Sequence, residues 1–171
     1  MQKFLFSEKN ISWLPAENVT ETYLSDEMPP LNLCVSVYSI VFKNDSLLMS
    51  DLREGQRPAR MLDIPGGHIE KGEKPEESVI RETFEETGVR VKVKKLFAYK
   101  KVTVTTPKPE KYRYPYPLSY MLFYLCEVVE ETPFEGNNDT HGRVWLSPQE
   151  FDKSPWYVDN KVLMKEIVKN K

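Results

Sequence analysis

The stretch from residue 66 to residue 89, GGHIEKGEKPEESVIRETFEETGV, constrains this chain more than any other. Pro75 suits a first helical turn, because its missing N–H would have no partner inside the helix there. Gly88 suits the left-handed residue that follows a helix end. The sequence therefore predicts a helix from about Pro75 to Thr87, preceded by a glycine loop.

Three glutamates are expected on one face of this helix. Glu82, Glu85 and Glu86 stand at positions i, i+3 and i+4. The carboxylates repel one another, and the helix dipole disfavours negative charge in the C-terminal half of a helix. A solvated acidic face is the simplest interpretation of such a pattern, but a hard divalent cation with oxygen ligands supplies the missing counter-charge. The opposite, buried face is predicted to carry Ile80, Thr83, Phe84 and Thr87.

These residues match a pattern of fixed spacing, G-x5-E-x7-R-E-U-x-E-E-x-G-U, in which U is an aliphatic residue. The stretch resembles the signature of the Nudix hydrolases, and eight matching positions make the resemblance specific. Thr83 departs from it, because the family usually has an aliphatic residue there. The matching residues are Gly67, Glu73, Arg81, Glu82, Glu85, Glu86, Gly88 and Val89.

The resemblance implies an α/β fold, an α/β/α sandwich with a mixed β-sheet between helices. It also implies Mg²⁺-dependent hydrolysis, with Mn²⁺ as an alternative metal, of the pyrophosphate bond in a nucleoside diphosphate linked to another group. A (d)NTP or modified nucleotide is the leading substrate, and a nucleoside monophosphate is the product. The alternatives are a nucleotide-sugar or ADP-ribose pyrophosphatase and a nucleotide-binding sensor without turnover.

The resemblance also assigns roles to individual residues. It implies metal ligation by Glu82, Glu85, Glu86 and the carbonyl of Gly66 or Gly67, of which Gly67 is the leading candidate. Glu82, Arg81 and Glu73 are the predicted catalytic residues: Arg81 would orient the glutamates, and Glu73 would reach Arg81 or a metal-bound water. His68 is predicted to support the site rather than act as a base. The family also places the base in a later loop, where Glu131 and Glu135 are alternatives to Glu82.

Two other segments carry candidate substrate-binding residues. Arginine forks match phosphate oxygens, so the polar loop at 53–60 is a candidate clamp, and a solvated loop is the alternative. The loop at 105–117 interleaves basic residues with tyrosines, which suits substrate recognition and a dimer or partner contact equally well. The candidates are Arg53, Arg57, Arg60, Tyr112, Arg113 and Tyr114.

Composition bounds the remaining possibilities. A chain of 171 residues with 40% hydrophobic content suits one domain, here assigned to residues 31–171, with an extension at 1–30 that packs on the core or on a partner. The net charge of -2 gives no reason to expect DNA or an anionic membrane as a partner; a homodimer stays open. Cys34 and Cys126 lie in apolar runs typical of buried free thiols, and no secretion leader or membrane span is predicted, so we expect a cytoplasmic protein.

Periodicity and turn residues predict the other elements. Strands are expected at 33–42 and 47–52, joined as a hairpin, and at 61–64, 119–129 and 143–146. Residues 89–104 suit one or two half-buried strands. A capping box at 147–150 opens a short helix, and an amphipathic helix closes the chain at about 159–169.

Overall fold

The structure, a computed structural model, describes residues 2–11, 14, 16–53 and 61–170. Within these residues the strands are β1 (Lys3–Lys9), β2 (Asn18–Leu24), β3 (Cys34–Lys43), β4 (Ser46–Leu52), β5 (Met61–Asp63), β6 (Gly66–His68), β7 (Val89–Val104), β8 (Leu118–Glu131) and β9 (Thr140–Leu146). The α-helices are α1 (Pro75–Thr87), α2 (Pro155–Asp159) and α3 (Lys161–Asn170), with 3-10 helices η1 (Leu31–Leu33) and η2 (Pro148–Lys153).

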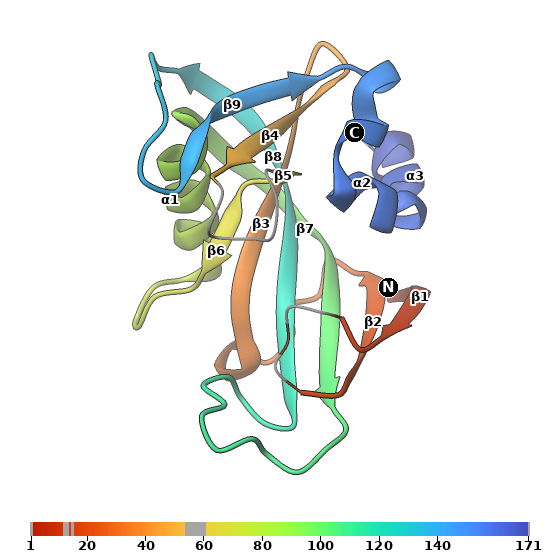
Figure 1. Ribbon diagram of the computed structural model, residues 1–171. Helices are drawn as coiled ribbons and strands as arrows, with labels where there is room; N and C mark the ends of the chain where they lie inside the picture. Colours follow the sequence, from red (N-terminus) through yellow and green to blue (C-terminus); the bar gives the residue numbers. More distant parts are fainter. Residues whose placement is uncertain (1, 12–13, 15, 54–60, 171) are drawn as a thin grey trace.

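The strands form a mixed sheet in the order β1-β2-β7-β8-β3-β4-β5, with β6 paired to β3 and β9 paired to β4. β3 and β8 run parallel, whereas β7 and β8, like β3 and β6, run antiparallel. Helix α1 lies on one side of the sheet, and α2 and α3 lie on the other (Figure 1). The predicted α/β/α sandwich is confirmed.

The sheet has a hydrophobic core on each side. Val37 and Leu122 belong to the cluster that contains Val79 of α1, whereas Ile40 belongs to the cluster that contains Leu163 of α3. All five side chains are fully buried, and burial of each contributes about 1.5–3 kcal/mol. Because β3 and β8 are covered on both faces, they read in the sequence as continuous apolar runs.

The N-terminal residues extend the sheet as two strands that the sequence analysis did not identify. β2 pairs antiparallel with β7 from Asn18 opposite Val104 to Leu24 opposite Ala98, and β1 pairs with β2. The inward positions of β2 include Thr20 and Thr22, each 1% exposed. These polar residues hide the alternation that indicates a half-buried strand.

Helix α1 has the predicted bounds, and Thr83 and Thr87 lie on its buried face as predicted. Its inward residues include Val79, Thr83 and Thr87, whereas Ile80 is 39% exposed, so the prediction for Ile80 is wrong. The helix turns its smaller residues to the sheet. The Thr83 hydroxyl contacts the Val79 carbonyl at 2.6 Å and the Ser39 hydroxyl at 2.8 Å, so burial leaves this polar group satisfied.

The other elements agree with the sequence to within a few residues. Residues 89–104 form one long strand whose register against β8 shifts at three points. β9 begins at Thr140, and the capping box at 147–150 opens the 3-10 helix η2. In the described part of the chain, none of the helices is long and apolar enough to cross a membrane.

Candidate active site

Gly66 and Gly67, here called the glycine turn, are the first residues of β6 and lie against β3 and α1. An added Cβ on Gly66 would stand 2.2 Å from the Val37 carbonyl oxygen, and one on Gly67 would stand 2.4 Å from the Glu82 carboxyl carbon. At Gly66 the clash is with backbone, so a larger residue would force the strands apart, whereas at Gly67 a larger residue would displace the Glu82 carboxylate. The consecutive glycines therefore bring the turn directly against a carboxylate of the helix.

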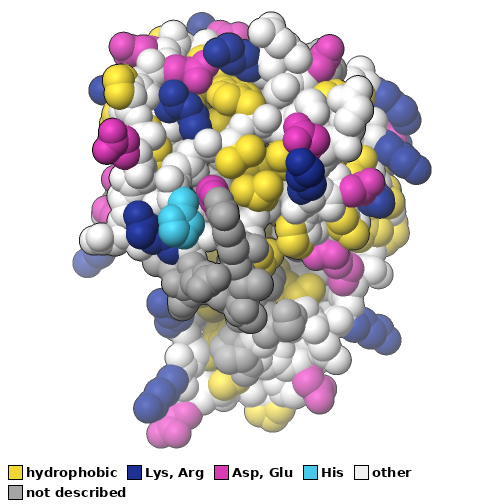
Figure 2. Space-filling model, turned by 45° about the horizontal axis from the view of Figure 1, so that its top comes forward, with side chains coloured by type: hydrophobic (Ala, Val, Ile, Leu, Met, Phe, Trp, Pro, Cys, Tyr) yellow, Lys and Arg dark blue, Asp and Glu magenta, His cyan; other side chains and the backbone are white. Residues whose placement is uncertain are grey.

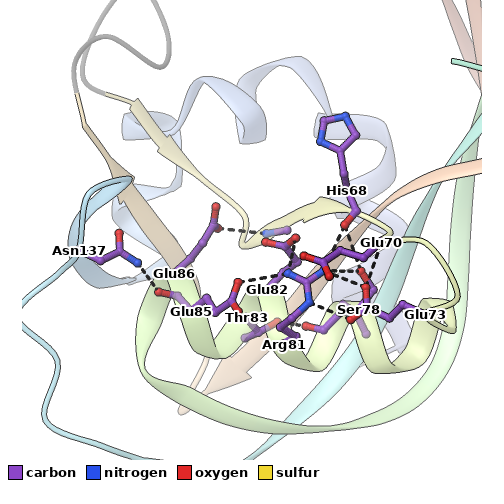
Figure 3. Close-up of polar contacts among 12 residues, drawn as sticks. His68, Glu70, Glu73, Ser78, Arg81, Glu82, Thr83, Glu85, Glu86 and Asn137 are labelled. Carbon is purple, nitrogen blue, oxygen red and sulfur yellow. Dashed lines mark hydrogen bonds and ion pairs between the residues drawn. The ribbon is translucent and has the colours of Figure 1, made fainter. Parts of the chain in front are cut away.

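Glu86 is held against this turn from two other elements. The Gly66 N–H donates to Glu86 Oε2 at 3.1 Å, and the Ser50 hydroxyl of β4 donates to the same oxygen at 2.7 Å. Figure 3 shows Glu86 and Glu82 on the side of α1 that faces β6. The structure thus brings two of the three predicted metal-binding glutamates to the glycine turn.

Arg81 connects the acidic residues of the site. It binds Glu73 through two hydrogen bonds of 2.8 and 2.9 Å, and its Nη1 donates to Glu82 at 2.8 Å and to Glu85 at 3.1 Å. Its Nη2 also donates to the carbonyl oxygen of His68 at 3.2 Å. The bidentate ion pair holds the pKa of Glu73 at about 2, and the same hydrogen bonds raise the pKa of Arg81.

Glu82 receives one hydrogen bond from Arg81, whereas the donors to Glu86 are the uncharged groups of Ser50 and Gly66. Burial raises the pKa of Glu86 to about 7, despite the opposing hydrogen bonds from Ser50 and Gly66. Burial also raises the pKa of Glu82, against the effect of Arg81. A buried carboxylate that is hard to ionise is one whose charged form needs a positive partner.

Glu85 differs from its neighbours because its side chain is 54% exposed and turns toward Arg81. Among the described residues, no three acidic, histidine or cysteine side chains converge as a ready-made metal site. The donor set still fits a hard cation, because Glu82 and Glu86 offer carboxylate oxygens one helical turn apart on the face of α1 that meets Gly66 and Gly67.

The backbone of the turn adds one more oxygen. In the β3–β6 ladder, Ser39 N–H donates to the Pro65 carbonyl, and Ile69 N–H donates to the Val35 carbonyl. Hydrogen-bonded pairs alternate along antiparallel strands, so Val37 and Gly67, midway between these two pairs, also form a hydrogen-bonded pair. The polar backbone groups of Gly67 therefore face β3. Those of Gly66, including the N–H bound to Glu86, face α1.

A segment far along the chain caps the C-terminal end of α1, and the sequence analysis did not identify it. The last carbonyl groups of a helix have no partner inside it. Here each of the four accepts a hydrogen bond from a residue between 132 and 143: Asn137 to Glu85 at 2.7 Å, Thr140 to Glu86 at 3.1 Å, Arg143 to Thr87 at 2.9 Å, and Thr132 to Gly88 at 2.9 Å.

Arg143 also places a positive charge at the end of the helix, where the dipole favours one. This cation reduces the cost of the three glutamates that end α1. The capping role of Arg143 has no signal in the sequence, because a single arginine in a strand is common. The same holds for Ser50 and its hydrogen bond to Glu86.

The two alternative bases lie in different settings. Glu131 is bound by Lys43, by the Trp145 indole N–H at 3.3 Å and by Arg143 at 3.4 Å. Its pKa is lowered, chiefly by the hydrogen bond from Lys43. Glu135 is exposed in the segment between β8 and β9.

The predicted substrate-binding residues lie in different surroundings. Arg53 is half-buried and donates through Nε to the Thr140 carbonyl oxygen at 3.1 Å, whereas Arg57 and Arg60 lie outside the described residues. Tyr112 is only 6% exposed, but Arg113 is exposed and Tyr114 lies beside His68.

Comparison with known proteins identifies the family. The NUDIX domain model matches residues 32–167. A MutT-like protein of Streptomyces ambofaciens is 41% identical over 76 residues, which are 44% of this chain and 47% of the relative. The chain therefore matches about half the length of that curated relative.

Solved structures agree in fold. The pyrophosphohydrolase BsRppH of Bacillus subtilis superposes with a TM-score of 0.64 at 21% identity, covering 90% of this chain and 89% of its own. A NUDIX hydrolase of Nitrosomonas europaea gives a TM-score of 0.57 at 19% identity, covering 78% and 88%. The chain belongs to the Nudix hydrolase family.

Proposed function

We propose that this protein is a magnesium-dependent pyrophosphohydrolase that cleaves a nucleoside diphosphate linked to another group, with (d)NTPs and modified nucleotides as the leading substrates. The observation that carries the proposal is the pair of half-buried carboxylates, Glu82 and Glu86, held against Gly67 and Gly66 with raised pKa values. The Bacillus subtilis neighbour is itself named a pyrophosphohydrolase, which is consistent with this class.

The proposed metal ligands are Glu82, Glu85, Glu86 and one carbonyl of the turn. For the carbonyl we favour Gly66 over the Gly67 predicted from the sequence, because the polar backbone groups of Gly66 face α1. A divalent cation, Mg²⁺ or Mn²⁺, would neutralise phosphate oxygens and lower the pKa of a bound water.

The protein residues would supply positioning and proton transfer. Arg81 holds Glu82 and Glu85 in place, and its ion pair with Glu73 fixes the guanidinium. Glu82 is the proposed general base, since its raised pKa brings it closer to neutral pH, where a base works best. Glu131 is less suited, because Lys43 and Arg143 stabilise its ionised form.

A hydrolysis screen tests the proposal. Purified protein is incubated with Mg²⁺ or Mn²⁺ and dNTPs, oxidised dNTPs, ADP-ribose, nucleotide sugars, dinucleoside polyphosphates and capped RNA, and the products are identified. We expect metal-dependent release of a nucleoside monophosphate from at least one class. Nucleotide binding without hydrolysis across the whole panel would favour the sensor instead.

The remaining parts of the proposal concern the cellular compartment, the partners and the oligomeric state of the protein. The free thiols of Cys34 and Cys126 are compatible with a reducing cytoplasm. Figure 2 shows basic and acidic side chains interspersed on one face, an arrangement that suits a small-molecule substrate better than a DNA partner. A homodimer stays a prediction, to be tested by the mass of the protein in solution.

A further inference from the structure

The loop between β7 and β8, residues 105–117, meets the strand that carries the glycine turn. The ring of Tyr114 lies parallel to the imidazole of His68, with 4° between their planes and 5.7 Å between their centroids. The Tyr114 hydroxyl is 3.1 Å from His68 Nε2, and Arg113 Nη2 donates to the same hydroxyl at 3.0 Å. We call Arg113, Tyr114 and His68 the loop triad.

The loop is packed so that the triad is held in place. Tyr112 is buried and makes edge-to-face contacts with the rings of Tyr114 at 5.5 Å and Tyr116 at 6.5 Å. The base of the loop is closed by a hydrogen bond from Val104 N–H to the Pro117 carbonyl at 2.9 Å. Tyr112 therefore serves as an internal support, whereas Arg113 points outward and is exposed.

The hydrogen bonds of the triad fix its protons. A guanidinium group only donates, so the Tyr114 hydroxyl accepts from Arg113 and is left with its own proton to give to His68 Nε2. The proton of a neutral His68 is then on Nδ1, where it is available as a donor.

Arg113 differs from most of the arginines that the structure describes. Arg81, Arg90 and Arg143 each pair with a carboxylate. Arg113 contacts only the ring and hydroxyl of Tyr114 within the described residues, which leaves most of its N–H donors unused. An exposed guanidinium with free donors, oriented by an aromatic ring, matches the oxygens of a phosphate group.

The position of the triad relates it to the proposed site. His68 directly follows Gly67, and its carbonyl oxygen accepts from Arg81, while its imidazole points away from the glutamates (Figure 3). The glutamates of α1 thus lie on one side of β6, and the loop triad lies on the other. His68 therefore links the two groups, with its carbonyl oxygen bound to Arg81 and its ring beside Tyr114.

We propose that Arg113, oriented by Tyr114, and the Nδ1–H of His68 bind a phosphate group of the substrate and so determine its affinity. This inference rests on the proposed function, since it concerns the same substrate. It assigns Arg113 and His68 to substrate binding and Tyr114 to positioning, and none of the three to bond cleavage.

The test compares Arg113→Gln and Tyr114→Phe with Lys111→Gln, which removes an exposed charge from the same loop. For each variant, KM and kcat are measured with ATP, or with the nucleotide that the wild type hydrolyses best. Equilibrium binding is measured with the hydrolysis-resistant α,β-methylene analogue of ATP and with inorganic triphosphate, both with Mg²⁺.

Arg113→Gln is expected to raise KM and both dissociation constants about tenfold, with kcat within about twofold of wild type, since one charge-assisted contact is lost. Tyr114→Phe keeps the ring but disconnects Arg113 from His68. KM and both dissociation constants are expected to rise about threefold in this variant. Lys111→Gln should leave every value unchanged.

Three results would overturn the inference: unchanged KM and binding in Arg113→Gln, an equal effect of Lys111→Gln, or weakened binding of the nucleotide analogue with unchanged binding of triphosphate. The last would mean that the triad contacts the base. Failure of the proposed function is a separate outcome, because the wild type would then bind the probes without hydrolysing any nucleotide.

Discussion

At the scale of single residues, the surroundings of Glu86 say most about the site. Its carboxylate is held by Ser50 and Gly66 in a buried position where ionisation is costly. A stabilising role alone would be served better by an uncharged side chain. The charged form of Glu86 therefore costs stability, as expected of a carboxylate that is proposed to bind a cation.

This cost predicts a pH-dependent effect of Glu86→Gln in metal-free protein. The pKa of Glu86 is about 7 in the folded protein, above its ordinary value of 4.5. A raised folded-state pKa means that the carboxyl favours folding while protonated, and that this contribution is lost as the pH rises from about 4.5 to about 7. Glu86→Gln should therefore raise the free energy of unfolding at pH 8 by up to about 3 kcal/mol, and by much less at pH 4.

Urea unfolding at the two pH values measures the difference. Glu85→Gln is the matched control, because its side chain is exposed and its charge is screened. A Glu86→Gln protein equally stabilised, or destabilised, at both values would contradict the buried-carboxylate account.

Gly67 provides a second residue-scale prediction. Gly67→Ala should weaken Mg²⁺ binding at least about tenfold and lower the free energy of unfolding by about 1–3 kcal/mol, because the new Cβ displaces the Glu82 carboxylate. Gly72 has a φ of +87° with open space around it. Gly72→Ala should therefore show only a backbone cost of about 1 kcal/mol and normal metal binding by calorimetry. Equal metal affinity in the two variants would be inconsistent with the close approach of Gly67 to Glu82.

At the scale of elements, the acidic end of α1 depends on residues supplied by β9 and the segment before it. Arg143→Gln should destabilise the protein by about 2–3 kcal/mol, because the Thr87 and Thr132 carbonyl groups and the Glu131 carboxylate lose a shared charged donor. Arg90→Gln, whose ion pair with Glu130 is exposed, should cost less than about 1 kcal/mol. Thermal unfolding of both proteins gives the comparison, and a similar Tm would argue against capping by Arg143.

The same elements show which features of α1 could be predicted from the sequence. The bounds of α1 follow from Pro75 and Gly88, because both residues act locally on the backbone. The glutamate face follows from helical spacing. On the opposite face, Thr83 and Thr87 are buried as predicted, with their hydroxyls bound to helix carbonyls, but Ile80 is exposed and Val79 takes an inward position instead.

The partners of the site were beyond sequence reasoning for a different reason. Ser50, Asn137 and Arg143 reach α1 through tertiary contacts that span 36 to 56 residues of chain. Their residue types are common in strands and loops, so neither spacing nor composition singles them out. Arg57 and Arg60, predicted as parts of a phosphate clamp, lie outside the described residues.

At the scale of the whole molecule, the N-terminal strands cover the edge of β7. β2 pairs along seven residues of β7. A protein that begins at residue 25 should expose this edge of β7, and unpaired edges promote association between chains. We expect lower stability and concentration-dependent association by light scattering, whereas a monomer as stable as the full chain would mean that the extension is dispensable for the core.

The proposal of a metal-dependent hydrolase depends on whether the carboxylates at the glycine turn bind a divalent cation. The most direct measurement is a calorimetric titration of metal-free protein with Mn²⁺ between pH 6 and 8, for the wild type and for Glu86→Gln. The account predicts binding that strengthens with pH as Glu86 loses its proton, and that falls at least about tenfold in the variant. Equal affinity in the two proteins, or no binding with and without nucleotide, would contradict it.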